Sequence, residues 1–497
     1  MNINSSYGTI CGMSRSFANF AGPGAAGSSR GNEACDRVQG DCFAFQESLG
    51  PNCASSNTVT YIFSDLEGKK AEVMGAVADS GGVVEQELPI IDGMTVTFSS
   101  DNVKTFENRM TGEFKGIKAD SDVSPCLYKS FYPSSFSVVD CGAGSKGDSL
   151  DVPAYYSNYF SGDPSRSGAI GEEKVASDTA VMHNAFIDSM NLDEIHASGI
   201  TGKGVGVCVI DSGIASHSDL AEPVAWKDFT KDASESPNDR MGHGTMVAGL
   251  IAGQGVESHG DIKGIAPGVD LIGAKIGKVS EGITALQWAI ENKDKYNIRV
   301  INISMGDKPS SFVNGDPWVK AVEKAVDAGI AVVVAAGNEG PDSSTITTPG
   351  TAGKAITVGA LDDRQTVAFG DDDVAELSSR GPTKSGLHKP DVLAPGVNII
   401  STLAENSFMD SRNVHSEYVI QSGSSLATPL VSGLCALLLQ ANPDLGVQDL
   451  KDIIGKTARP VAGRGVDDQG GGAIDPGRAV EMALAMKNNQ EAGTSLA

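Results

Sequence analysis

Between residues 186 and 480, short apolar runs alternate with longer segments of helical spacing. The apolar runs cover residues 205–210, 271–276, 299–304, 330–335 and 355–359, and helices are expected near residues 243–253, 280–295, 317–328, 425–440, 447–456 and 476–487. Runs that are apolar at nearly every position predict strands buried on both faces, which is typical of a parallel sheet covered by helices. The sequence therefore predicts an α/β fold with helices on both faces of a parallel sheet.

Three residues at the ends of these elements have the chemistry of a nucleophilic site. Asp211 ends the first run, His243 lies between two glycines at the start of an apolar helix, and Ser425 opens the helix at 425–440. Taken singly, they read as a turn or capping aspartate, a helix-start histidine and an N-cap serine. Together they supply an orienting carboxylate, a base and a nucleophile, in the chain order Asp, His, Ser.

Four motifs now identify a resemblance: residues 209–213 (VIDSG), 242–245 (GHGT), 335–340 (AAGNEG) and 423–429 (GSSLATP). In this order they resemble the subtilases, the subtilisin-like serine proteases. The likeness covers residues 186–480 strongly and 57–123 moderately. Ser424 stands where the family usually has Thr, and Leu426 where it usually has Met, so the fine positioning of the serine motif departs from the family pattern.

The resemblance implies a serine endopeptidase that acts on polypeptide substrates through Asp211, His243 and Ser425. Asn338 matches the family's oxyanion-hole asparagine. The walls of the primary specificity pocket are implied at six positions, which are Ser304, Met305, Gly306, Ala335, Ala336 and Gly337. No cofactor is required for such chemistry, and the sequence assigns no metal ligand. Calcium is common in the family, but residues 253–260 lack its asparagine-rich calcium loop, so no calcium site is located.

Two residues near the implied pocket give conflicting indications of specificity. Thr347 would lie near the pocket base, where a threonine shortens the pocket and favours small side chains. Glu339 at the rim would attract basic ones. The sequence leaves this choice open.

The chain before the peptidase-like region divides into three parts. Residues 57–123 carry a βαββαβ pattern, with a last strand near 114–118, which predicts a small ferredoxin-like α+β domain. It resembles the inhibitory pro-domain of many subtilases, although an unrelated small domain would show the same pattern. Residues 1–56 form a Cys-, Gly- and Ser-rich extension, and residues 124–185 a linker that would hold the processing site. Residues 481–497 are expected to be a polar C-terminal tail.

Two rival interpretations of the site remain. One is a catalytically silent subtilase-fold protein that binds peptides, although the set of Asp211, His243, Asn338 and Ser425 argues against it because a binder needs none of them together. The other is a serine-carboxyl peptidase, which shares a similar serine motif but uses a glutamate base and would leave His243 idle.

The net charge limits the kinds of partner, and the positions of the cysteines bear on the cellular compartment. The formal net charge is −25, which argues against nucleic acid and anionic membranes as partners. No apolar run reaches the length of a membrane span. The start of the chain lacks a recognisable secretory signal, yet six of eight cysteines lie outside the predicted core, and Cys126 and Cys141 would pair if the chain is exported. Export is favoured, with an intracellular location as the alternative.

Overall fold

The computed structural model describes residues 58–99, 101–103, 118–121, 183–307, 315–409 and 417–494. It separates into two compact units, one ending at Ser121 and the other running from Asp122 to the end, with the short segment Leu88–Asp92 assigned to the second. The predicted extension 1–56, most of the linker 124–185, and six of the eight cysteines lie outside the described residues.

The first unit is a four-stranded antiparallel sheet with a helix. Its strands are β1 (Thr58–Ser64), β2 (Val83–Leu88), β3 (Gly93–Ser99) and β4 (Lys118–Ser121), and the helix is α2 (Lys70–Asp79). The strand order is β2-β3-β1-β4, which is the ferredoxin-like order. Phe63, Val77 and Phe98 are among the residues of its apolar core. The strand β4 begins at 118, later than the predicted 114, and residues 104–117 lie outside the described part.

The second unit is built on an eight-stranded sheet with the path β11-β10-β9-β8-β5-β7-β6, with β12 paired beside β10. Its strands are β5 (Gly206–Asp211), β6 (Ala225–Asp228), β7 (Asp270–Lys275), β8 (Ile298–Ile303), β9 (Ala331–Ala335), β10 (Ile356–Asp362), β11 (Asp373–Val374) and β12 (Val392–Pro395). Every pairing is parallel except that of β10 with β11. The predicted parallel sheet is confirmed, and the short strands β6, β11 and β12 are additions to it.

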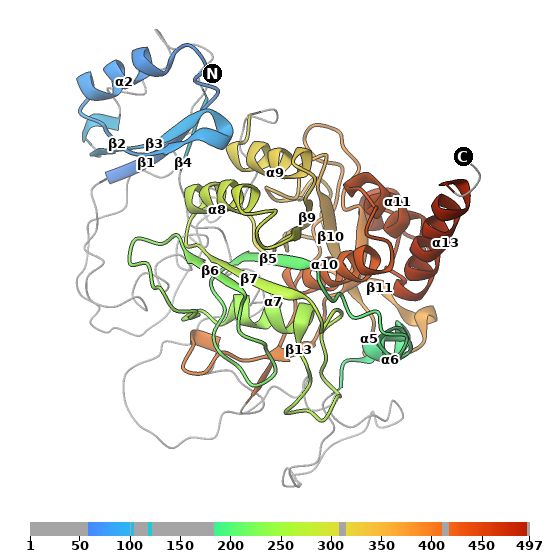
Figure 1. Ribbon diagram of the computed structural model, residues 1–497. Coiled ribbons are helices and arrows are strands. Elements are labelled where there is room, and N and C mark those ends of the chain that lie inside the picture. Colours follow the sequence, from blue (N-terminus) through green and yellow to red (C-terminus); the bar gives the residue numbers. More distant parts are fainter. Residues whose placement is uncertain are drawn as a thin grey trace, which may run out of the picture. The chain divides into compact units, whose positions relative to one another are not determined.

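Helices cover both faces of this sheet (Figure 1). The helices α7 (His243–Ala252) and α10 (Ser424–Ala441) pack together on one face, and α8 (Val279–Glu291) and α9 (Pro317–Asp327) pack together on the other. The helix α10 is buried along its length except at Gln440. Among the described helices, it is the one long and apolar enough to cross a membrane by composition, and its burial inside the unit accounts for that composition.

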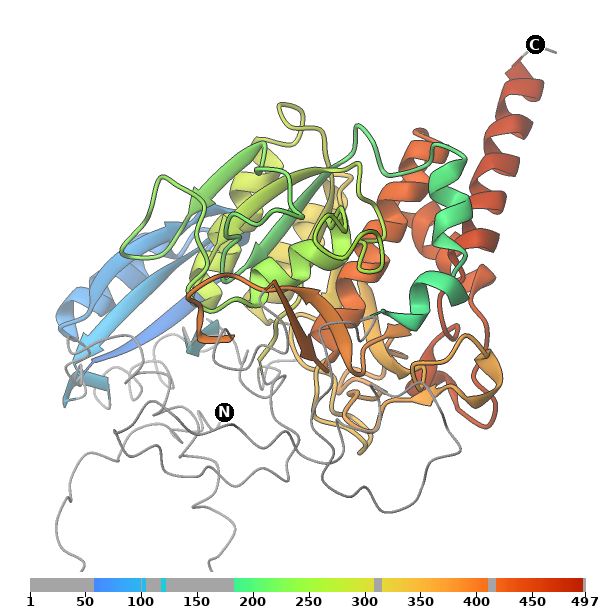
Figure 2. The same cartoon turned by 90° about the horizontal axis from the view of Figure 1, so that it is seen from below.

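Smaller elements complete the second unit. They are the helices α5 (Ala185–Ser189), α6 (Leu192–Ala197), α11 (Val447–Thr457), α12 (Val466–Gln469) and α13 (Pro476–Thr494), and the hairpin of β13 (Ile399–Thr402) and β14 (Tyr418–Gln421). The helix α13 runs beyond residue 487, through much of the predicted tail 481–497 (Figure 2). Lys487, Gln490, Glu491 and Ala492 in this tail are good helix formers, so a mostly polar segment continues the helix.

The chain order of the strands locates a crevice. The strand β5 lies between β7 and β8, so the chain first builds the sheet to one side of β5 and then crosses to the other side. In open α/β sheets, ligands bind outside the carboxyl ends of the strands at such a switch point. Asp211 is the last residue of β5 and stands at this point.

Candidate active site

Asp211 and His243 form a buried hydrogen-bonded pair. His243 Nδ1 lies 2.7 Å from Asp211 Oδ1, and both side chains are fully buried. Because an ionised carboxylate only accepts hydrogen bonds, Nδ1 carries the proton and Nε2 is the ring atom able to accept one. The same Asp211 oxygen accepts a hydrogen bond from Ser212 N at 2.7 Å.

A close backbone approach makes this pair possible. The first turn of α7 runs against the turn that follows β5, and a Cβ at Gly244 would lie 2.0 Å from the Gly213 carbonyl oxygen and 3.1 Å from Asp211 Cβ. Glycine is the residue that permits this contact. Gly244 therefore permits the close packing of the two turns that carry Asp211 and His243.

The charged state of His243 is stabilised by its neighbours. Burial opposes the positive charge, but the charge of Asp211, its hydrogen bond and the charge of Asp239 together raise the pKa of His243 above its ordinary value. An imidazole whose charged form is supported in this way is suited to take up a proton during a reaction.

Ser425 lies at the start of α10, on the same face of the sheet as His243. It is the second residue of the helix, it is 2% exposed, and its Oγ has no hydrogen-bond partner among the described residues. It therefore does not hydrogen-bond His243 in this structure. Catalytic hydrogen bonds are often long or misaligned until substrate is bound.

Asn338 is tied to the same helix start. Its Oδ1 accepts a hydrogen bond from Ser424 N at 2.8 Å. Ser424 Oγ in turn contacts both the N–H and the carbonyl oxygen of Gly337, each at 3.1 Å. These bonds fix the end of β9 against the start of α10, and Ser424 thus performs a positioning task through its hydroxyl.

The residues expected to wall a pocket come together around Thr347. The stretch 304–306 follows β8, and residues 335–337 end β9, which is the neighbouring strand. A Cβ at Gly306 would lie 2.7 Å from Thr347 Oγ1, and a Cβ at Gly337 would lie 2.6 Å from the same atom. Thr347 Oγ1 also donates to the Ala336 carbonyl oxygen at 3.2 Å. The threonine therefore fills the space between the two stretches, and it is buried.

Asp239 was not singled out from the sequence. It is buried beside the Asp211–His243 pair and accepts hydrogen bonds from both turns that carry the pair. Its position four residues before His243 in the stretch Asp239-Arg240-Met241-Gly242-His243 is a signal that could have found it, since a carboxylate just before a helix start is typical of a capping role.

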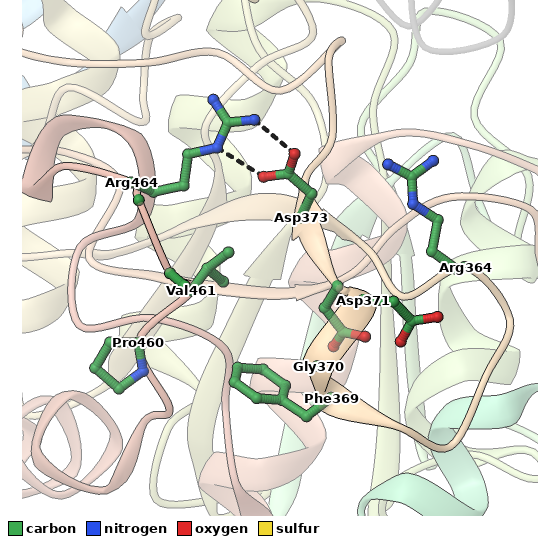
Figure 3. Close-up of a pocket in the computed structure, with 11 residues that line it drawn as sticks. Arg364, Phe369, Gly370, Asp371, Asp373, Pro460, Val461 and Arg464 are labelled. Atoms are coloured by element: carbon green, nitrogen blue, oxygen red, sulfur yellow. Dashed lines mark hydrogen bonds and ion pairs between the residues drawn. The ribbon is translucent and has the colours of Figure 1, made fainter.

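A separate pocket of about 510 Å³ lies between the 364–373 loop and residues 460–464 (Figure 3). It contains none of the residues predicted for the site. Within the described part of the chain, no group of three or more His, Cys, Asp or Glu side chains is arranged to hold a metal ion.

Comparison with known proteins finds a matching family and similar proteins. The family model described as the subtilase family matches residues 202–474. Serine protease AprX of Bacillus subtilis (strain 168) is 45% identical over 271 residues, which are 51% of this chain and 61% of that protein. Subtilisin DY of Bacillus licheniformis is 33% identical over 281 residues, which are 55% of this chain and 90% of subtilisin DY. Subtilisin E of Bacillus subtilis (strain 168) is 33% identical over 298 residues, which are 58% of this chain and 69% of subtilisin E.

Proposed function

The chain belongs to the subtilase family of serine-type endopeptidases, and from this premise we propose that it hydrolyses polypeptides through Asp211, His243 and Ser425. The observation that carries this proposal is the buried 2.7 Å pair of His243 and Asp211 at the carboxyl end of β5. The start of α10, with Ser425, lies on the same face of the sheet.

In the proposed mechanism, Ser425 Oγ attacks the peptide carbonyl carbon while His243 Nε2 takes its proton. Asp211 holds the Nδ1–H tautomer and stabilises the imidazolium. His243 then gives the proton to the leaving amine, and an acyl-enzyme remains on Ser425. Water hydrolyses this ester by the same steps, with His243 again as the base.

Asn338 is the proposed donor to the oxygen that becomes negative in the tetrahedral intermediate. Because Asn338 Oδ1 accepts the hydrogen bond from Ser424 N, the amide nitrogen of Asn338 points away from Ser424 N. The N–H of Ser425, in the first turn of α10, is the second proposed donor, and the helix N-terminus adds a positive field.

Small side chains are the proposed preference at the primary pocket. The walls would be residues 304–306 and 335–337, and Thr347 fills the space between Gly306 and Gly337. Of the two conflicting indications in the sequence, this contact supports the small-residue one over attraction of basic side chains by Glu339. The natural substrates would be polypeptides with a short side chain before the cleaved bond.

We further propose that the first unit is an inhibitory pro-domain and that the chain processes itself. Support comes from its ferredoxin-like strand order and from its place on the N-terminal side of the family-matched region. Cleavage would fall in residues 124–185. The cysteine pattern favours export, and a peptide linking Cys126 to Cys141 in non-reducing mass spectrometry of protein from its native compartment would support it. Two thiols there would favour the intracellular alternative.

A fluorophosphonate probe tests the central claim. Processed protein without its first unit should be labelled at Ser425 and should cleave a protein substrate. Correctly folded protein that is neither labelled nor active would overturn the proposal in favour of a silent peptide binder. If His243→Ala kept near-wild-type activity, the serine-carboxyl mechanism with a glutamate base would replace it.

A further inference from the structure

Asp239 is a second carboxylate beside the Asp211–His243 pair, and it is 5% exposed. Its Oδ1 accepts hydrogen bonds from Ser212 Oγ at 2.9 Å, Met241 N at 3.1 Å and Gly242 N at 2.9 Å. Its Oδ2 accepts from both the N and the Oγ1 of Thr245 at 2.9 Å. Five donors therefore converge on one buried side chain.

These donors come from the two turns that carry the reacting groups. Gly242 and Thr245 flank His243 at the start of α7, while Ser212 follows Asp211 directly. Ser212 Oγ also accepts a hydrogen bond from Gly244 N at 3.0 Å, so it bridges the two turns a second time. A change in the Asp239 side chain would thus shift the Asp211 turn and the His243 turn relative to one another.

The contacts stabilise a negative charge on Asp239. Three of its five partners are backbone N–H groups, which can only donate, and they reach both carboxylate oxygens, while the hydroxyls of Ser212 and Thr245 can donate or accept. Burial raises the pKa of Asp239, and so does the charge of Asp211, whereas the hydrogen bonds from Gly242 and Thr245 act against that rise. These N–H donors favour the ionised form of the buried carboxylate.

The charge of Asp239 acts on the imidazole together with that of Asp211. These two carboxylates are the charged groups that act on His243, and Asp211 is the one that acts on Asp239. Among the cations near this loop, Lys275 at the end of β7 is hydrogen-bonded to Asn238 Oδ1, and Arg240, the residue after Asp239, is exposed. Each negative charge near a histidine ring favours the imidazolium.

We propose that Asp239 is a positioning residue for the peptidase reaction, which fixes the His243 turn against the Asp211 turn and supports the imidazolium by its charge. The proposal rests on the function proposed above, because it gives Asp239 its role through His243. Asp239 itself touches neither the nucleophile nor, in this arrangement, the substrate.

The test is Asp239→Asn in the full chain, assayed after processing. The amide keeps the volume but turns an NH₂ group toward donors on one side, so the turns loosen and one negative charge is lost. We expect kcat to fall about tenfold to a hundredfold with little change in KM, as for a misplaced catalytic group. The acid limb of the kcat/KM profile should move to lower pH, because His243 loses one of its stabilising charges.

Two further variants separate this role from general stability. Asp316 is also buried and caps α9 by accepting from Trp318 N and Val319 N, so Asp316→Ala removes a buried carboxylate cap away from the site. It should lower stability and leave both kcat and the acid limb unchanged. Ser212→Ala keeps the Asp239 charge but removes the bridging hydroxyl, so it should lower kcat without moving the acid limb.

The outcomes are distinct. If wild-type protein has no activity and no labelled Ser425, the proposed function fails and Asp239 is not at issue. If wild type is active and Asp239→Asn matches it in kcat and in the acid limb, the positioning role is wrong. A lowered kcat with an unmoved acid limb would reduce Asp239 to a structural part. Should Asp239→Asn not fold, Ser212→Ala decides whether the bridge matters: wild-type kcat in that variant would overturn the positioning role.

Discussion

Two regions of the second unit gather buried carboxylates, and they differ in how many donors surround the negative charge. Around His243, five donors reach Asp239 and two reach Asp211 Oδ1 at 2.7–3.1 Å, and Asp211 Oδ2 is the one carboxylate oxygen of this pair without a hydrogen-bond partner among the described residues. In the loop between β10 and β11, Asp363 Oδ2 and Asp372 Oδ1 are buried and have no hydrogen-bond partner among the described residues. Burial raises the pKa of Asp363 to about 7 and that of Asp372 to about 6.

The contrast shows why a shifted pKa and a pocket do not by themselves locate a catalytic site. The 510 Å³ pocket is lined by Asp372, one of the two carboxylates with raised pKa values, yet its lining contains no residue of the proposed triad (Figure 3). The pKa values of Asp363 and Asp372 are raised by burial and by the negative charges of neighbouring aspartates. At the other region, donors hold Asp239 and Asp211 Oδ1 in place, and Asp211 stands at the end of β5 with His243 hydrogen-bonded to it, which is the arrangement that directed proton transfer needs.

Removal of the nucleophile is the largest expected effect and tests one side of this contrast. Ser425→Ala should lower kcat on the order of 10⁶-fold, the loss that subtilisin itself shows when its serine is removed. The variant should also accumulate as the uncut chain of 497 residues, while wild type yields a form beginning between about 124 and 185. Gel electrophoresis and N-terminal sequencing in a protease-poor host measure both.

The cleavage should be independent of protein concentration, because the bond lies in the same chain as Ser425. If Ser425→Ala were cut at the same bond as wild type, processing would belong to another enzyme. That result would leave the hydrolytic proposal standing and remove the self-processing one.

Loss of the oxyanion donor is the next largest effect. Asn338→Ala should lower kcat about 10²–10³-fold, the loss for the corresponding donor in subtilisin, with KM changing far less. Asn442→Ala serves as a control, since it removes a buried amide at the far end of α10. The control should cost stability and spare turnover. Equal losses in binding and turnover for Asn338→Ala would contradict its role.

The sequence alone was sufficient for the parallel sheet and the four long helices around it, because apolar runs are local signals, while the three triad positions stay a prediction that rests on short motifs. Asp239 was missed because its importance depends on five hydrogen bonds that fold back from Ser212, Met241, Gly242 and Thr245. The raised pKa of Asp363 was also beyond reach, since it depends on burial and on the approach of Asp372. The strand β11 has two residues, too few for any periodicity.

The loop between β10 and β11 should limit stability at neutral pH. The pKa of Asp363 in the folded protein, about 7, lies above its ordinary value of 3.8. The folded state therefore holds the proton more tightly than the unfolded state does. The protonated carboxyl group contributes its full stabilisation of the folded state below about pH 4, and this contribution is lost as pH rises to 7. Asp363→Asn should raise the unfolding free energy by about 1–3 kcal/mol above pH 7, after the cost of a buried NH₂ group.

Urea unfolding at pH 4.5 and pH 8 measures this change, and the gain should be confined to the higher pH. The amide oxygen can still accept from Gln365 N, as Asp363 Oδ1 does at 3.1 Å. Activity should stay at the wild-type level. An equal effect at both pH values would mean that the carboxyl group is not charged at pH 8, which would weaken the contrast between the two regions.

The smallest expected effect comes from the ion pair at the mouth of the same pocket. Arg464 donates from Nε and Nη2 to the two oxygens of Asp373, each at 2.6 Å. The side chains are 31% and 35% exposed, so water screens the pair, and Arg464→Gln should cost less than about 1 kcal/mol. Because the hydrogen bond from Arg464 lowers the pKa of Asp373, this loss of stability should be present at pH 7 and fade as pH falls below 4.

Urea unfolding at pH 7 and pH 3 measures the loss of stability, with kcat/KM as the second readout. A several-fold fall in kcat/KM would connect this pocket to catalysis and erase the distinction between the two regions.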